Sequence, residues 1–157
     1  MKQHLSIKVA ALLFGGFALN SASAGDLFKP GLWEETTIKD GITNNPKGHV
    51  DYKCWTSAQI ASLGSRESLW NAMSSKMDKS CTLKSYILNG GTLSYEIACK
   101  AGSGISAKVV AKSPTSKLVA ATMNFGQGPG SSESSDRWVS ADCGEHGDSD
   151  IPADEGE

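Results

Sequence analysis

Two cysteines at the ends of two strand-like segments constrain this chain more than any other feature of its sequence. Residues 81–88 (CTLKSYIL) and 92–99 (TLSYEIAC) are separated by Asn89-Gly90-Gly91. Both segments contain residues that favour strands, and glycine can supply the left-handed residue of a three-residue hairpin loop. The sequence therefore predicts an antiparallel hairpin whose two free ends carry Cys81 and Cys99.

One register of this hairpin satisfies several requirements at once. It opposes Leu88 and Thr92, Ile87 and Leu93, Ser85 and Tyr95, Lys84 and Glu96, Leu83 and Ile97, and finally Cys81 and Cys99. The result is a mostly apolar face, with an opposite-charge pair on the other face. A slip of one residue breaks all of these pairings together. We therefore expect a Cys81–Cys99 disulfide and, by subtraction, a Cys54–Cys143 disulfide.

The cysteine count supports the same interpretation. The chain has four cysteines, all after residue 24. An even number of cysteines in an exported protein indicates two disulfides, although four cysteines allow three connectivities. A zinc site is the alternative, but the chain has no Cys-x-x-Cys motif and no close Cys/His pair.

The N-terminus has the three parts of a secretory signal peptide. Lys2 and Lys8 precede an apolar run at residues 9–19, and Ala22-Ser23-Ala24 supplies the small residues that a signal peptidase reads. The apolar run is shorter than the about 20 residues that span a bilayer, which disfavours the alternative of an uncleaved anchor. We expect residues 1–24 to be removed by cleavage between Ala24 and Gly25, with no stable membrane insertion afterwards.

Residues 25–143 are predicted to form one mainly β (α+β) domain. We expect a single antiparallel β-sheet built from hairpins, with a short helical insertion and two disulfides. Besides the hairpin, strands are expected at residues 31–39, 50–55, 104–112, 117–125 and 137–142. Residues 126–136 (GQGPGSSESSD) are expected to form a flexible loop because they are rich in glycine and serine.

The helical insertion has its own start and stop signals. Thr56 and Gln59 have the spacing of a capping box, Gly64 is expected to end the first helix, and a second helical segment is expected near Ser65. Leu69, Trp70, Met73 and Met77 recur at helical spacing. This periodicity predicts that one helical face packs on the sheet.

The C-terminal residues 144–157 form an acidic tail. They include six acidic residues and no lysine or arginine, and we expect this tail to be disordered. Asp148, Asp150 and Asp154 could chelate calcium loosely, but they do not form an EF-hand loop. The remaining domain is nearly neutral and concentrates no basic face, so we expect no nucleic-acid binding.

The sequence contains none of the motifs that carry common catalytic chemistry. Beyond residue 24 it has two histidines, His49 and His146, and it has no nucleophile elbow, zinc-protease helix, Walker loop or dinucleotide fingerprint. Glu34 and Glu35 are adjacent in a predicted strand, so they point to opposite faces and cannot act as an acid–base pair. We expect a non-enzymatic protein without a cofactor or metal, with carboxylates brought together by the fold as the open alternative.

Four tryptophans are many for a domain of this length. Trp33, Trp55, Trp70 and Trp138 could line a ligand-binding concavity, because aromatic side chains dominate such pockets. The alternative, which we favour, is that they fill the core and cover the hairpin disulfide.

Several short motifs together resemble a known family. They are Pro30-Gly31-Leu32-Trp33-Glu34 after the signal peptide, Lys53-Cys54-Trp55-Thr56 at a helix start, the Cys81…Cys99 hairpin and the terminal Asp142-Cys143. In this combination the chain resembles the bacterial exported domain-of-unknown-function family 3617, over roughly residues 30–143. Trp55 and the acidic tail depart from the family pattern. The resemblance implies a small exported protein of Gram-negative bacteria, located in the periplasm, and it implies no activity.

The sequence therefore leaves three functional hypotheses. The first is a non-enzymatic periplasmic binding or envelope-associated domain, whose partner is a small apolar ligand or an envelope protein. The second is an inhibitor or chaperone-like partner of an envelope enzyme, acting through the 126–136 loop. The third is an enzyme without a recognisable motif.

Overall fold

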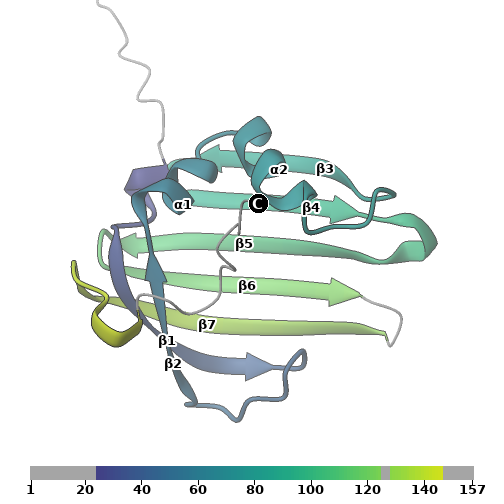
Figure 1. The fold of residues 1–157 in the computed structure, drawn as a ribbon. Coiled ribbons are helices and arrows are strands. Elements are labelled where there is room, and N and C mark those ends of the chain that lie inside the picture. Colours follow the sequence, from purple (N-terminus) through teal and green to yellow (C-terminus); the bar gives the residue numbers. More distant parts are fainter. Residues whose placement is uncertain (1–23, 125–127, 147–157) are drawn as a thin grey trace, which may run out of the picture.

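The computed structural model describes residues 24–124 and 128–146, so the predicted signal peptide up to residue 23 and the tail beyond residue 146 lie outside the described residues. These residues form one seven-stranded antiparallel sheet with two short helices (Figure 1), which confirms the predicted fold class. The strands are β1 (Gly31–Asp40), β2 (Val50–Trp55), β3 (Thr82–Asn89), β4 (Thr92–Ala98), β5 (Gly104–Ser113), β6 (Ser116–Asn124) and β7 (Pro129–Ser140). The helices are α1 (Ser57–Ser62) and α2 (Arg66–Ser74), with 3₁₀ turns η1 (Ala24–Asp26), η2 (Lys100–Gly102) and η3 (Gly144–His146).

The strand order is β2-β1-β7-β6-β5-β4-β3. Strands β3 to β7 therefore follow one another as a meander, whereas β1 lies between β2 and the last strand, β7. Among the described strands, β2 and β3 form the two edges. The structure joins Cys54 at the end of β2 to Cys143 just after β7, and Cys81 to Cys99 across the β3–β4 hairpin. This is the pairing that the sequence predicts.

The β3–β4 hairpin differs from the predicted register at its turn. Gly90 and Gly91 both have positive φ angles, 53° and 83°, and they form a two-residue turn that opposes Asn89 and Thr92. Two left-handed glycines suit the twist of a hairpin better than the predicted three-residue loop. The predicted pairs of Leu88 with Thr92, Ile87 with Leu93, Ser85 with Tyr95 and Lys84 with Glu96 are therefore wrong by one residue.

A β-bulge restores the predicted register at the other end of the hairpin. The shift lies between Leu83 and Ser85, and Leu83 pairs with Ile97 as predicted. The Arg66 guanidinium donates hydrogen bonds to the carbonyl oxygens of Leu83 and Lys84, the second at 3.5 Å. Because the bulge absorbs one residue, the hairpin has both a tight glycine turn and opposed cysteines.

Strand β7 overturns the prediction of a flexible loop at 126–136. Residues 125–127 are not described, but β7 begins at Pro129 and pairs with β1 on one side and β6 on the other. A central strand gains hydrogen bonds along both edges, and this tertiary context outweighs the weak strand propensity of Gly and Ser. A Cβ on Gly130 would lie 2.6 Å from the carbonyl oxygen of Gly41, so glycine allows the close approach of the neighbouring backbone.

The helices begin at capping boxes. The Thr56 and Gln59 pair caps α1 as predicted, and Ser65 with Ser68 caps α2 in the same way. Figure 1 shows both helices over β3 and β4. Ile60 and Leu69 are buried there, against inner-face side chains that include Leu83, Leu93, Ile97 and Val109.

We call the face of the sheet beneath the helices the inner face, and its opposite the outer face. Long side chains on the inner face reach across neighbouring strands. The Lys117 ammonium on β6 lies 5.6 Å from the Trp55 ring centroid on β2, although two strands separate β2 from β6. Residues of β1, β2, β6 and β7 line a hollow on this part of the inner face, and no residue of α1 or α2 belongs to its lining.

Candidate functional site

The uncovered half of the inner face contains a hollow of about 330 Å³, which we call the polar hollow. Its lining residues come from β1, the loop that follows it, β2, β6 and β7. They are Glu35, Thr37, Lys39, Asp40, Ile42, Thr43, Asn45, Asp51, Lys53, Val119, Ala121, Met123, Ser132, Glu133 and Ser134. The size lies within the range of small-molecule sites, which is roughly 300–1,000 Å³.

The floor of the polar hollow combines apolar and hydroxyl side chains. Val119, Ala121 and Met123 alternate along β6 and therefore share the inner face. Beside them Ser134 on β7 and Thr37 on β1 are buried and occupy neighbouring cross-strand positions. An apolar stripe flanked by a few polar groups is typical of a site that holds an organic molecule.

A row of charged residues crosses the inner face at one end of the polar hollow. Asp51 on β2 opposes Glu35 on β1, Glu35 opposes Asp136 on β7, and Asp136 opposes Lys117 on β6. Lys53 also belongs to this cluster, because its Nζ lies 2.5 Å from Oε2 of Glu35. The fold thus brings together carboxylates from distant segments, which the sequence motifs did not indicate.

Lys117 is the most buried member of this charged row. Its side chain is 1% exposed, and its Nζ lies 3.5 Å from Oδ2 of Asp136. The Nζ also lies 3.5 Å from the ring centroid of Trp33 and 4.3 Å from that of Phe28. No described residue accepts a hydrogen bond from Nζ. The ammonium is therefore stabilised by one carboxylate and by the negative faces of aromatic rings.

Burial shifts the pKa values of Lys117 and Asp136 in the directions that favour the uncharged side chains. Burial lowers the pKa of Lys117 to about 8, although the charge of Asp136 acts to raise it. Burial raises the pKa of Asp136, while Lys117 and the Ser134 hydroxyl, which donates to Oδ1 at 2.8 Å, act to lower it. The pair exists at this position because each charge offsets part of the desolvation of the other.

The loop after β1 closes the other end of the polar hollow. The Thr43 hydroxyl and the backbone N–H groups of Thr43, Ile42 and Asn45 donate hydrogen bonds to the Asp40 carboxylate. These bonds, the Thr43 hydroxyl first, hold the pKa of Asp40 well below its usual range. Asp40 therefore remains ionised while it organises the loop.

The four tryptophans do not gather around the polar hollow. Trp33 is buried and Trp55 is half-buried, and both surround the Lys117 ammonium. Trp70 lies on α2 and packs against the buried cluster that contains Cys81. The Trp138 Nε1 donates to the Pro30 carbonyl at 3.0 Å, and the Lys29 ammonium lies over its ring.

The predicted cleavage position lies at the start of the described residues. Ala24 and Gly25 belong to η1, and Ala24 is buried in the core beside Leu27 and Phe28. Its carbonyl oxygen accepts hydrogen bonds from the N–H groups of Leu27 and Phe28, both at 3.0 Å. Cleavage between Ala24 and Gly25 stays a prediction, and it would remove these contacts.

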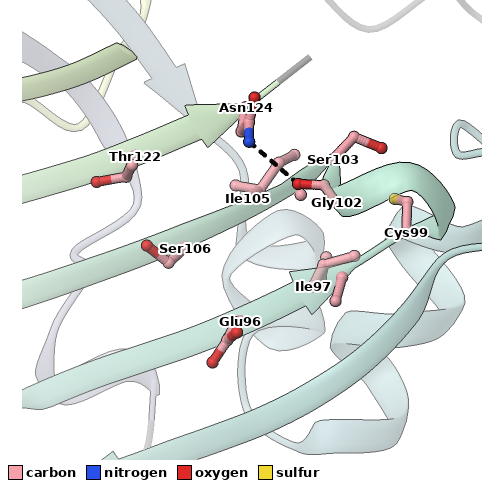
Figure 2. Close-up of a pocket in the computed structure, with 11 residues that line it drawn as sticks. Glu96, Ile97, Cys99, Gly102, Ser103, Ile105, Ser106, Thr122 and Asn124 are labelled. Carbon is pink, nitrogen blue, oxygen red and sulfur yellow. Dashed lines mark hydrogen bonds between the residues drawn. The ribbon is translucent and has the colours of Figure 1, made fainter. Parts of the chain in front are cut away.

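Two other hollows are lined by fewer charged residues. Figure 2 shows a pocket of about 230 Å³ near the end of β4, β5 and β6, with Glu96, Ser106 and Thr122 in a row on neighbouring strands. Glu96 is its one charged lining residue, and the Asn124 amide donates to the Gly102 carbonyl at 3.1 Å. A second hollow lies between α2 and β3, beside Arg66 and Trp70. The polar hollow contains more charged groups than either.

The inward charge on β6 had a sequence signal that motif searches do not use. In the segment 117–123 (KLVAATM), Lys117 shares its parity with Val119, Ala121 and Met123. A lysine in phase with an apolar stripe points into the core, where it requires a counter-charge. Its partner Asp136 lies in the segment predicted as a loop, so the pair could not be found from the sequence.

Two features of other functional classes are not found in the described part of the chain. No group of three or more His, Cys, Asp or Glu residues is arranged to hold a metal ion there. No helix among residues 24–124 and 128–146 is long and apolar enough to cross a membrane.

Comparison with known proteins identifies a family for this chain. No curated protein and no solved structure matches the chain. A family model described as a protein of unknown function, DUF3617, matches residues 28–143. This match covers the whole sheet, both helices and all four cysteines. The chain therefore belongs to the DUF3617 family.

Proposed function

We propose that this protein is a non-enzymatic binding domain of the bacterial periplasm and that the polar hollow is its ligand site. The observation that carries the proposal is the asymmetry of the inner face. Helices cover its β3–β4 side, whereas the β1, β2, β6 and β7 side encloses a hollow of about 330 Å³ with an apolar floor and a charged rim. Natural ligand sites commonly combine these features.

The contacts of the charged row support binding rather than catalysis. Glu35 is paired with Lys53, and Asp136 is buried with Lys117 and Ser134. A general acid or base must reach a proton of the substrate, with a pKa near the working pH. The Asp136 side chain is only 6% exposed, and Glu35 is already paired with the Lys53 ammonium group.

Export is supported by the cysteine chemistry together with the N-terminal segment. Both cysteine pairs are joined across the sheet, and structural disulfides persist in oxidising compartments such as the periplasm. The apolar run at residues 9–19 and Ala22-Ser23-Ala24 provide the export signal.

The inhibitor or chaperone-like hypothesis loses its structural basis. It relied on a mobile loop at 126–136, but residues 129–136 belong to the central strand β7. A strand paired on both edges cannot act as a free capture loop.

Native intact mass spectrometry of the protein, isolated from envelope extract without reductant, tests the proposal. We expect the mass of residues 25–157 less four hydrogens, together with a discrete small-molecule adduct. Ala121→Phe fills the floor of the polar hollow and should remove the adduct. Ala120→Phe is the matched control, because Ala120 is the neighbouring residue on the exposed outer face.

Two results would contradict the proposal. An adduct that survives Ala121→Phe would place the ligand elsewhere on the molecule. A bare chain of the expected mass, together with a partner protein captured equally by the wild type and Ala121→Phe, would replace the ligand site by a protein interface.

A further inference from the structure

We infer that the polar hollow binds a small organic cation, namely a primary ammonium group on a short aliphatic body. The inference rests on the proposed function and names the ligand class of the same site. It follows from the charge balance of the hollow, from the carboxylate that remains open to a ligand, and from the apolar stripe on β6.

The polar hollow carries an excess of negative charge. Its inner-face charges, with the adjoining buried pair, are the carboxylates of Glu35, Asp40, Asp51 and Asp136 and the ammonium groups of Lys53 and Lys117. Four carboxylates and two ammonium groups give a net charge of −2. Lys39 and Glu133 also line the hollow and carry opposite charges, so they leave this net charge unchanged. An anionic ligand would add to this excess, whereas a cation offsets it.

Asp51 is the carboxylate best placed to receive the cation. Asp40 is occupied by the N–H groups of its own loop, Asp136 is buried with Lys117, and Glu35 is paired with Lys53. The Asp51 side chain is 50% exposed, and its contact with Nε2 of His49, at 3.3 Å, involves Oδ2. An ammonium group at Asp51 would also lie beside Glu35, the cross-strand neighbour of Asp51.

The apolar stripe on β6 determines which chemistry suits the rest of the ligand, beyond the ammonium group. Val119, Ala121 and Met123 present aliphatic surface to the same hollow, so the body beyond the ammonium group is apolar. The hydroxyls of Thr37 and Ser134 flank that stripe.

Three probes with the same six-carbon body separate charge from apolar contact. They are n-hexylammonium, hexanoate and 1-hexanol, titrated into the full-length exported protein while the methyl NMR signals of Met123, Ala121 and Val119 are recorded. We expect hexylammonium to bind at least about fivefold more tightly than 1-hexanol, with hexanoate weaker than both, and the preference should shrink as salt screens it.

Two substitutions should change the affinity in opposite directions. Asp51→Asn removes a negative charge and should weaken hexylammonium binding about two- to fivefold, the range of exposed ion pairs. Lys53→Gln releases Glu35 and should strengthen binding by a similar factor. Glu96→Gln is the matched control, because it removes an exposed carboxylate from β4 on the outer face, and it should leave the affinity unchanged.

Each result has a definite meaning. Tighter binding of hexanoate than of hexylammonium at the same methyl groups would overturn the inferred ligand class and retain the ligand site. Equal affinities for hexylammonium and 1-hexanol would also overturn the ligand class. The same conclusion would follow if neither Asp51→Asn nor Lys53→Gln changed the affinity for hexylammonium. No methyl shift with any of the three probes would overturn the inference, while the adduct measured by native mass spectrometry judges the proposed function separately.

Discussion

The two halves of the inner face belong to one hydrogen-bonded sheet, but one half is apolar and the other is polar and charged. Toward β3 and β4 the inner face is apolar, and α1 and α2 cover it around Leu93 and Ile97. Toward β1 and β7 it carries the buried Lys117–Asp136 pair, hydroxyls and an open hollow. Apolar burial supplies most folding free energy, whereas buried charges consume part of it. The comparison indicates that the first half supplies most of the folding free energy, whereas the second half contains the hollow in which we propose that a ligand binds.

Each half also has its own disulfide, and removing each one separates their contributions. Cys54–Cys143 links residues 89 apart beside the polar half, and Cys81–Cys99 links residues 18 apart in the apolar half. On the chain-entropy model, opening the longer loop by Cys54→Ser/Cys143→Ser costs about 4.5 kcal/mol, against about 3 kcal/mol for the shorter loop. Urea unfolding of both double variants measures this. A larger loss from the shorter loop would mean that the apolar half depends on its disulfide more than on packing.

Lys117→Met tests the buried pair of the polar half. It leaves the Asp136 carboxylate buried without its counter-ion, and we expect a loss of about 3 kcal/mol in the free energy of unfolding. The double variant Lys117→Met/Asp136→Asn removes both charges and should recover most of this loss. Chemical denaturation of the single and double variants forms the test. Equal losses in the two variants would show that packing by the lysine stem, rather than charge, matters at this position.

The pH dependence of stability should distinguish the two halves further. Because the folded pKa of Lys117 is about 8 and its unfolded value is near 10.5, the unfolded chain binds more protons between these pH values. The contribution of Lys117 to stability therefore rises with pH across this window, by at most about 3.5 kcal/mol at ~1.4 kcal/mol per pKa unit. The difference between wild type and Lys117→Met should grow from pH 8 to 10.5. Leu93→Ala, in the apolar half, should give a difference that is independent of pH.

The smallest expected effect on stability concerns helix α1, which covers the apolar half of the inner face. Thr56→Ala removes the hydroxyl that accepts a hydrogen bond from the Gln59 N–H, and it should cost about 1 kcal/mol. Thermal unfolding measures this, with Ile87→Ala as the control because Ile87 is 56% exposed on the outer face. A loss from Thr56→Ala no larger than that from the control would mean that α1 is held by packing alone.

The sequence predicted the apolar half better than the polar half, and the reasons are physical. Local signals were sufficient for the α1 capping box, the strands around Val109 and the opposed pair of Leu83 and Ile97. The hairpin turn was wrong by one residue because a bulge has no local sequence signature here. Its stabilising partner, Arg66, lies in a helix that precedes the hairpin.

The polar half depends on contacts that no local pattern encodes. Ser134 and Asp136 sit in a segment with the composition of a loop, and they become strand residues because β1 and β6 supply hydrogen bonds on both sides. The parity of Lys117 with the apolar stripe of β6 indicates an inward lysine, but it does not indicate that Asp136 and Trp33 surround the ammonium group. Motif and propensity reasoning therefore missed both the charged row and the polar hollow.

The position of β1 also determines the order in which this fold can be completed. Glu34 and Arg137 are cross-strand partners although they are 103 residues apart in the chain. Until β7 has been made, β1 and β2 have no place in the sheet, and β6 presents an unpaired edge. Pairings between such distant segments are slow to form and leave partly folded chains open to aggregation. The sheet can therefore be completed only after β7 is present. In a chain shortened before residue 129, β1 and β2 would have no strand through which to join the sheet.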